Sequence, residues 1–180
     1  MSKVQTDNSY LELKIEMRVK HLPPKEYISV LDIYSGDGLI WNAVKSRTNK
    51  KITVLRIDRK LDKKGVYLKG DNLKYLDSID LDQFDVIDVD AYVIPFKQLK
   101  NILERNYKGV VFITYIQSMF GALPKEMLMQ LGFSSAMIKK IPSIFNQKGL
   151  QKLFDWLSIK GIKKVKYYDL NRKNYLIINY

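Results

Sequence analysis

The amino-acid sequence predicts a doubly wound α/β fold, with a mostly parallel sheet, helices on both faces and a C-terminal antiparallel hairpin. Strand-like and helix-like segments alternate five times along the chain, which is typical of parallel sheets covered by helices. The run 109–116, GVVFITYI, is apolar and β-branched, as expected of a buried central strand. Two further strand-like runs, 163–170 and 175–180, are joined by four polar residues that indicate a hairpin.

The remaining elements follow from the period of the apolar residues and from the turn residues between them. Residues 10–20 alternate apolar and polar side chains like a strand, but their composition favours a helix, which is the structure we expect. Pro23 and Pro24 end that helix. Segment 133–145 has no clear preference. Strands are predicted at 27–34, 52–57, 66–68 and 84–89, and helices at 39–47, 73–76, 96–106, 124–131 and 148–160.

Composition bounds the kind of protein. The chain has 180 residues, of which 46% are hydrophobic, and it carries no repeat or low-complexity linker, so we expect one domain over 1–180. It has no cysteine and a single histidine, His21, which argues against transition-metal sites and hydrolase triads. No apolar run is long enough to span a bilayer, and the first residues do not resemble a signal peptide. We therefore expect a cytoplasmic protein without a membrane partner.

The charge balance favours a polyanionic partner. Lys and Arg total 31 against 19 Asp and Glu, a formal net charge of +12. Segment 139–173 alone holds ten basic residues and two acids, so most of the excess falls in one part of the chain. This skew predicts a basic C-terminal face that could bind nucleic acid. A generally lysine-rich proteome is the other explanation of the same count.

The stretch 29–40, SVLDIYSGDGLI, is the most informative local pattern. A strand with one acid, Asp32, runs into a small-residue turn, and a helix follows. Glycines at 36 and 38 allow backbone angles and close approaches that a Cβ forbids. The pattern is neither G-x-G-x-x-G nor a P-loop. Taken alone, it fits an ordinary strand-to-helix turn equally well.

Four segments in order resemble the motifs of class I S-adenosylmethionine-dependent methyltransferases. These are VLDIYSGDG at 30–38, VLRIDRK at 54–60, GDNLKYL at 70–76 and FDVIDVDAY at 84–92. The resemblance covers about residues 27–180 and implies this family's Rossmann-like fold and its cofactor, S-adenosyl-L-methionine. Tyr34 occupies the position of the family's first glycine, as in many members that act on RNA or DNA.

The resemblance assigns cofactor roles to the acids that follow the strands. Asp58 would accept the ribose hydroxyls, and Asp32 would position the turn and reach the methionine amine through water. Asp71 would accept the adenine amine, with a backbone N–H from Asn72 or Leu73. Singly, Asp58 and Asp71 could instead be helix N-caps or turn residues. The predicted cofactor-binding set is Asp32, Tyr34, Gly36, Asp37, Gly38, Asp58, Arg59, Asp71, Asn72 and Leu73.

The fourth motif bears on the acceptor. It is similar to the Asp-Pro-aromatic-Gly motif of tRNA guanine N2-methyltransferases, which implies Asp90 and Tyr92 as catalytic residues. A carboxylate there can hold the target amine, and an aromatic ring can stack on an extruded base. The sequence departs from this motif at Ala91, where proline is usual, and at Val93, where glycine is usual.

The resulting hypothesis is a methyltransferase that acts on nucleic acid, with RNA preferred over DNA and a base nitrogen as the acceptor. The alternatives are a methyltransferase for a protein or small molecule, and a catalytically inactive nucleic-acid-binding or partner subunit of the same fold. We expect residues 1–26 to form an N-terminal extension and residues 117–147 to cover the acceptor site. We expect no appended recognition domain, so a partner chain could supply specificity.

Overall fold

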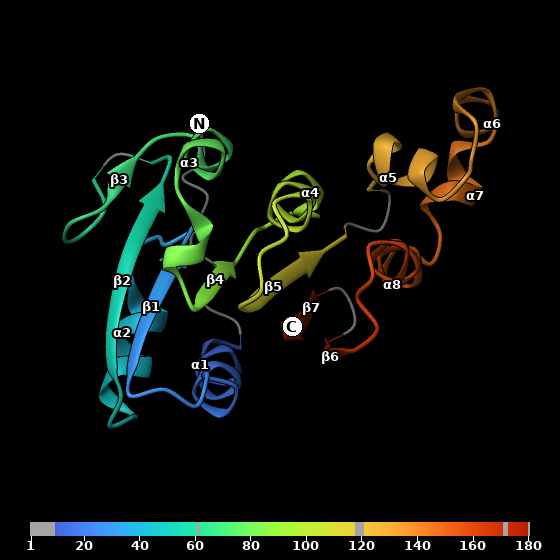
Figure 1. The fold of residues 1–180 in the computed structure, drawn as a ribbon. Helices are drawn as coiled ribbons and strands as arrows, with labels where there is room; N and C mark the ends of the chain where they lie inside the picture. The colour runs from blue at the N-terminus through green and yellow to red at the C-terminus, as the bar shows by residue number, and fades with distance from the viewer. Residues whose placement is uncertain (1–9, 61, 118–120, 171–172, 180) are drawn as a thin grey trace.

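The structure is a computed structural model that describes residues 10–60, 62–117, 121–170 and 173–179. It contains a seven-stranded sheet in the order β3-β2-β1-β4-β5-β7-β6, crossed by helices on both faces (Figure 1). The predicted fold class is confirmed, including the C-terminal antiparallel hairpin.

The strands lie close to where the sequence predicts them. β5 pairs in parallel with β4 and antiparallel with β7, which makes it the link between the parallel part and the hairpin. The strand bounds are β1 Tyr27–Asp32, β2 Lys51–Asp58, β3 Leu68–Lys69, β4 Val86–Val89, β5 Val110–Ile116, β6 Val165–Leu170 and β7 Lys173–Asn179.

The helices are also close to their expected positions, and segment 133–145 contains two short helices, α6 and α7. Pro142 begins α7, a position at which proline costs no helical hydrogen bond. The helix bounds are α1 Leu11–Lys20, α2 Leu39–Ser46, α3 Asn72–Ser78, α4 Phe96–Glu104, α5 Lys125–Gln130, α6 Ser135–Lys140, α7 Pro142–Asn146 and α8 Gly149–Ile159, with a 3-10 turn at Leu81–Gln83. None of the helices in the described ranges is long and apolar enough to cross a membrane.

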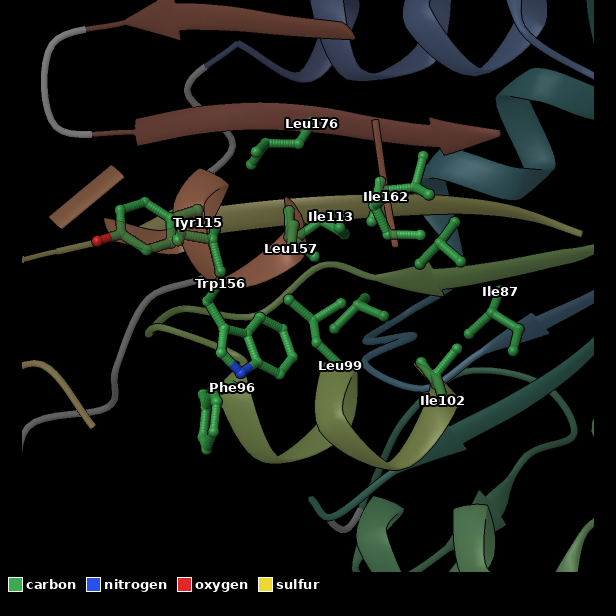
Figure 2. Close-up of a cluster of buried hydrophobic side chains, with 14 of the residues drawn as sticks. Ile87, Phe96, Leu99, Ile102, Ile113, Tyr115, Trp156, Leu157, Ile162 and Leu176 are labelled. Atoms are coloured by element: carbon green, nitrogen blue, oxygen red, sulfur yellow. The ribbon is translucent and has the colours of Figure 1, made fainter. Parts of the chain in front are cut away.

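One face of the sheet is covered by α3, α4 and α8. Apolar side chains of α4 and α8 pack on β4 and β5, and the rings of Phe96 and Trp156 meet edge to face at 5.0 Å (Figure 2). Burial of large apolar side chains of this kind is the main driving force that holds such layers together.

The other face is covered by α1 and α2. Trp41 of α2 and Ile15 and Met17 of α1 pack against β1, β5 and β7, and all three are at most 3% exposed. Helix α1 is unusual because two of its basic residues, Lys14 and Arg18, also point inward and are buried. The N-terminal extension therefore reaches the carboxyl ends of the central strands.

Candidate functional site

A cavity of about 880 Å³ opens at the carboxyl ends of β1, β2 and β4. The order of the strands reverses between β1 and β4, and open α/β sheets bind ligands at such a switch point. Of the predicted site residues, all but Gly38 line this cavity. The lining residues are Leu11, Lys14, Asp32, Ile33, Tyr34, Ser35, Gly36, Asp37, Leu39, Ile40, Asp58, Arg59, Lys60, Lys63, Asp71, Asn72, Leu73, Asp88, Asp90, Tyr92 and Gln98.

Asp58 lies at the tip of β2 and faces the glycine turn. Its Oδ2 accepts a hydrogen bond from the backbone N–H of Gly36 at 2.8 Å, and its Oδ1 accepts one from the N–H of Lys60 at 2.7 Å. Each carboxylate oxygen can accept more than one hydrogen bond, so both oxygens can still receive ligand hydroxyls. Asp58 thus ties the turn after β1 to the turn after β2.

The two glycines of the turn serve different purposes. Gly36 has φ +50° and faces open space, since a Cβ there would meet no atom within 4 Å. Gly38 has φ +75° and lies outside the cavity lining, and a Cβ there would stand 2.9 Å from the guanidinium carbon of Arg56. Arg56 donates to the carbonyl oxygens of Gly36 and Lys64, both at 2.7 Å. Gly38 therefore makes room for a guanidinium that clamps the turn.

The third motif lies at the start of α3. Asp71 is the N-cap of this helix, because its carboxylate accepts from the backbone N–H of Leu73 at 2.9 Å. Asn72 donates to the carbonyl oxygen of Ile33 and accepts from the side chain of Gln98. The carboxylate of Asp71 thus has the capping role as well as a place in the cavity wall.

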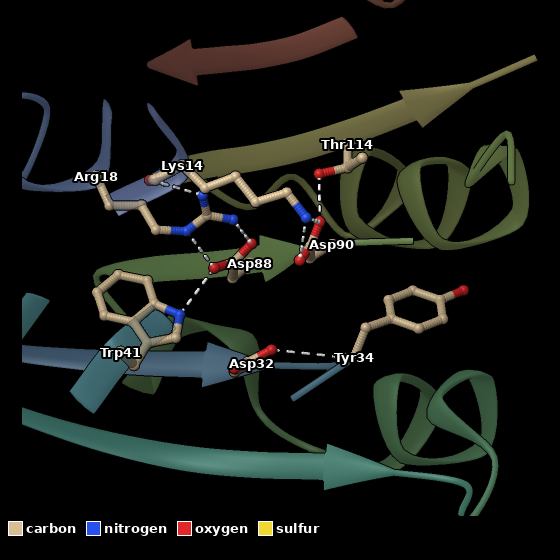
Figure 3. A network of polar contacts seen from close by, with 8 residues as sticks. All are labelled: Lys14, Arg18, Asp32, Tyr34, Trp41, Asp88, Asp90 and Thr114. Atoms are coloured by element: carbon tan, nitrogen blue, oxygen red, sulfur yellow. Dashed lines mark hydrogen bonds and ion pairs between the residues drawn. The ribbon is translucent and has the colours of Figure 1, made fainter. Parts of the chain in front are cut away.

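A group of buried charges forms the floor of the cavity (Figure 3). Arg18 donates to both oxygens of Asp88 at 2.6 Å, and Asp88 also accepts from the indole N–H of Trp41 at 2.7 Å. Burial works to lower the pKa of Arg18, but Asp88, together with the charges of Asp90 and Asp32, outweighs it, so the pKa is raised and the guanidinium stays charged. A buried pair of this kind is satisfied by two parallel hydrogen bonds.

Asp32 stands next to this pair with few partners of its own. It is 5% exposed and accepts one hydrogen bond in the described structure, from the N–H of Tyr34 at 3.3 Å. Burial, followed by repulsion from Asp88, raises its pKa well above the ordinary range. If all were ionised, the acids Asp32, Asp88 and Asp90 would exceed the cations Lys14 and Arg18 by one negative charge. The floor is therefore suited to a ligand that carries a positive charge.

Replacing Asp32 by asparagine is expected to stabilise the ligand-free protein near pH 7.5. A carboxyl group with a raised folded-state pKa contributes stability at pH values below its unfolded pKa, and this contribution is lost as pH rises through the folded pKa. The asparagine side chain cannot ionise, so the variant should melt near the wild-type temperature at pH 4 and higher at pH 7.5, by about 1 kcal/mol or a few degrees.

Thermal melting between pH 4 and pH 8 measures this difference. The matched control is Asp82→Asn, at an exposed acid in the 3-10 turn. A D32N variant that is less stable than wild type at every pH would contradict the raised pKa.

One part of the cavity wall is built around Asp90. Lys14 donates to both of its oxygens at 2.7 and 2.8 Å, and the hydroxyl of Thr114 on β5 donates to Oδ1 at 2.5 Å (Figure 3). Burial alone would raise the pKa of Asp90, but Lys14 and then Arg18 outweigh it, and the pKa lies below its ordinary value. Asp90 is therefore a fixed carboxylate that can accept hydrogen bonds and cannot donate them.

The loop after β4 has Ala91 in place of the motif's proline, and Ala91 makes a backbone hydrogen bond. The N–H of Ala91 donates to the carbonyl oxygen of Val89 at 3.0 Å, a bond that proline could not make. Ala91 itself is 1% exposed, whereas Tyr92 is 47% exposed at the cavity wall. The tight turn holds Asp90 and Tyr92 on the cavity side.

Sequence reasoning missed the contribution of α1 to this site. Lys14 and Leu11 line the cavity, but lysine is usually a surface residue and its partner lies 76 positions away. No residue that lines the cavity comes from the described part of 117–147. Positions 118–120 of that predicted cover lie outside the described residues.

Comparison with known proteins identifies the fold. No protein-family model matches the chain, and no curated protein matches it. A ribosomal protein L11 methylase from Lactobacillus delbrueckii subsp. bulgaricus aligns with 97% of this chain and 80% of its own, at a TM-score of 0.59 and 15% identity. A SAM-dependent methyltransferase from Archaeoglobus fulgidus aligns with 97% of both chains at a TM-score of 0.57 and 15% identity.

A precorrin-6y C5,15-methyltransferase from Geobacter metallireducens is similar as well. It covers 100% of this chain and 92% of its own at a TM-score of 0.56 and 12% identity. The chain thus has the fold of class I S-adenosylmethionine-dependent methyltransferases. The names of these neighbours span a protein and a small-molecule substrate, so the shared fold leaves the substrate class open.

The residues of the cavity fit the cofactor of that fold. Ser35 lines the cavity, and its buried hydroxyl has no hydrogen-bond partner among the described residues. The open space above Gly36 admits a ligand close to the backbone. A positively charged ligand favours the ionised form of Asp32, so the floor suits the ammonium group of S-adenosyl-L-methionine. The buried hydroxyl of Ser35, the open space above Gly36 and the acids of the floor are therefore compatible with the cofactor of this fold.

Proposed function

We propose that this protein is an S-adenosyl-L-methionine-dependent methyltransferase that modifies a base nitrogen in nucleic acid, with RNA preferred over DNA. The observation that supports it most is the row of carboxylates at successive strand ends. Asp32 and Asp58 are the last residues of β1 and β2, Asp90 directly follows β4, and all three line one cavity. In this arrangement Asp58 holds the ribose, and the side of the cavity with Asp90 and Tyr92 receives the acceptor.

The chain's own residues then do the work of positioning. The bound cofactor supplies an activated methyl group on a sulfonium, so no side chain needs to create a leaving group. Asp90 accepts a hydrogen bond from the target nitrogen and aligns it, and Tyr92 lies against the face of the base. Catalysis of this kind depends on proximity and orientation.

The basic residues support a nucleic-acid substrate. Lys60 and Lys63 line the cavity beside Arg59, which adds positive charge at its rim. In segment 139–173, burial and then repulsion from Lys148 lower the pKa of Lys152. Among the described residues of that segment, the exposed basic ones are Lys139, Lys140, Lys148, Lys163, Lys164 and Lys166.

Methyl transfer from radiolabelled S-adenosyl-L-methionine tests the function. The acceptors to compare are bulk tRNA, ribosomal RNA, DNA and a mixture of ribosomal proteins. Label in RNA, with substrate binding that weakens steeply as salt rises, is the expected result. Label in protein would favour the alternative acceptor class, and no binding of the cofactor at millimolar concentration would exclude both enzymes.

Replacing Asp58 by alanine should weaken cofactor binding by about 1–3 kcal/mol, because charge-assisted hydrogen bonds to the ribose are lost. Isothermal titration calorimetry with S-adenosyl-L-methionine measures the effect. Asp62→Ala, in the same loop, is the control for the loss of one negative charge. Unchanged affinity in Asp58→Ala would show that the ribose is bound elsewhere.

A further inference from the structure

Helix α1 places a cation inside the acceptor end of the cavity. The ammonium of Lys14 lies 2.7 and 2.8 Å from the two oxygens of Asp90, and both residues line the cavity. Their side chains are 8% and 13% exposed. The wall therefore presents a positive and a negative group side by side, in a place where little water screens them.

The pair is held rigidly. The backbone carbonyl of Lys14 accepts from Arg18 at 2.9 Å, and the other nitrogens of that guanidinium bind Asp88. The ammonium also lies 5.5 Å from the centre of the Tyr175 ring, a cation–π distance. Supporting contacts of this kind fix a recognition group in one geometry.

Hydrogen-bond chemistry defines what such a pair can bind. Asp90 only accepts and Lys14 only donates. We propose that the two residues together recognise the methyl acceptor as a neutral group in which an N–H donor stands directly beside a hydrogen-bond acceptor, as on the Watson–Crick edge of an unpaired nucleobase. This inference rests on the proposed function and names the part of the substrate that is read.

Charged acceptors fit the pair poorly. A lysine side chain or a protein N-terminus offers only donors and a positive charge, which Lys14 repels. A carboxylate or phosphate is repelled by Asp90. Each nucleobase presents a donor beside an acceptor on its pairing edge, and in a duplex these groups are already used. The substrate base must therefore be single-stranded or extruded from its helix.

Ligand binding tests the recognition of a base edge separately from methyl transfer. The protein, saturated with S-adenosylhomocysteine, is mixed in turn with the four ribonucleoside 5′-monophosphates, with ribose 5-phosphate and with N-acetyl-lysine methyl ester. Saturation-transfer NMR reports contact. Base protons of the nucleotides should show contact, while ribose 5-phosphate and the lysine ester should not. Lys14→Met should weaken nucleotide binding about 10-fold or more, and Lys20→Met, on the exposed side of α1, should not change it.

Methyl transfer to a single-stranded RNA and to a duplex that contains the same sequence is the second arm. Transfer to the single strand alone, reduced at least 10-fold in Lys14→Met, is expected. Nucleotide binding that depends on Lys14, without any methyl transfer, would support the proposed recognition of a base edge and overturn the proposed methyltransferase activity. Methyl transfer or nucleotide binding at wild-type levels in Lys14→Met would overturn the proposed recognition of a base edge. It would not contradict the proposed methyltransferase activity.

A second variant guards against loss of the fold. Lys14→Met leaves the carboxylate of Asp90 without its main partner, so its thermal melting must be measured first. The double variant Lys14→Met, Asp90→Asn has no unpaired charge and retains the shape of both side chains. Nucleotide binding retained in this folded double variant would overturn the inference, and its loss would support it.

Discussion

Replacing Arg18 by methionine should lower the free energy of unfolding by about 3–5 kcal/mol, because the change leaves the buried carboxylate of Asp88 without its counter-charge. Arg18 is fully buried, and its partner is 1% exposed. The indole N–H of Trp41 would be the single side-chain donor left to Asp88 among the hydrogen bonds described. Chemical denaturation at pH 7.5 measures the loss.

Two comparisons make this measurement specific. Arg47→Met removes an exposed ion pair with Glu12 and should cost at most about 1 kcal/mol. The double variant Arg18→Met, Asp88→Leu removes both charges and should recover much of the stability, since apolar replacements of whole buried pairs are often nearly neutral. If Arg18→Met costs no more than Arg47→Met, the buried pair does not anchor α1.

The pair of Arg18 and Asp88 connects helix α1 to the strand ends beside the cavity. Helix α1 packs on α2 through apolar side chains, which alone would leave its rotation about its own axis weakly defined. The bidentate bond from Arg18 to Asp88 fixes that rotation. Lys14, one helical turn earlier, is thereby aimed at Asp90. Helix α1 thus connects the buried pair of Arg18 and Asp88 to Lys14 in the cavity wall.

The fold could be read from the sequence because its signals are local. Apolar strands such as 109–116 and the turn residues between elements specify alternation, and alternation specifies parallel strands. The acids Asp32, Asp58 and Asp90 could be predicted as neighbours because each follows a strand of that sheet. All three line the cavity.

The partners of those acids could not be predicted in the same way. Lys14 and Arg18 meet β4 across 70 or more positions, and the alternating pattern of 10–20 does not show which polar residues turn inward. Likewise, glycine at 38 indicated a tight turn, but only the structure shows the guanidinium of Arg56 that occupies the space. Long-range pairing of charges carries no local signal.

Asp32 lowers the stability of the ligand-free protein. It is buried beside two other acids, and the described contacts supply too little positive charge to neutralise all three. Sites of this kind trade stability for function, since the charge that destabilises the empty site attracts a cationic ligand. The expected gain in stability of Asp32→Asn should therefore be accompanied by weaker cofactor binding.

Replacing Asp90 by alanine should reduce methyl transfer by about 10²–10⁴-fold, because the acceptor loses the carboxylate that aligns it. Cofactor affinity should stay within about twofold of wild type if Asp58 and the glycine turn hold the cofactor. Single-turnover transfer to RNA and calorimetry with S-adenosyl-L-methionine separate the two effects. Transfer that survives in Asp90→Ala would show that the acceptor is aligned by another group.

The dependence of methyl transfer on pH gives a second test of the role of Asp90. The lowered pKa of Asp90 means that its stabilising interactions are present above the unfolded pKa and are lost only as pH falls through the lower folded value. Between pH 8 and pH 5 the carboxylate remains ionised, so transfer should not fall on account of Asp90. In Lys14→Met the counter-charge is gone and burial raises the pKa of Asp90, so an acid limb should enter this window. An acid limb that is already present in wild type and unchanged in Lys14→Met would assign it to a group other than Asp90.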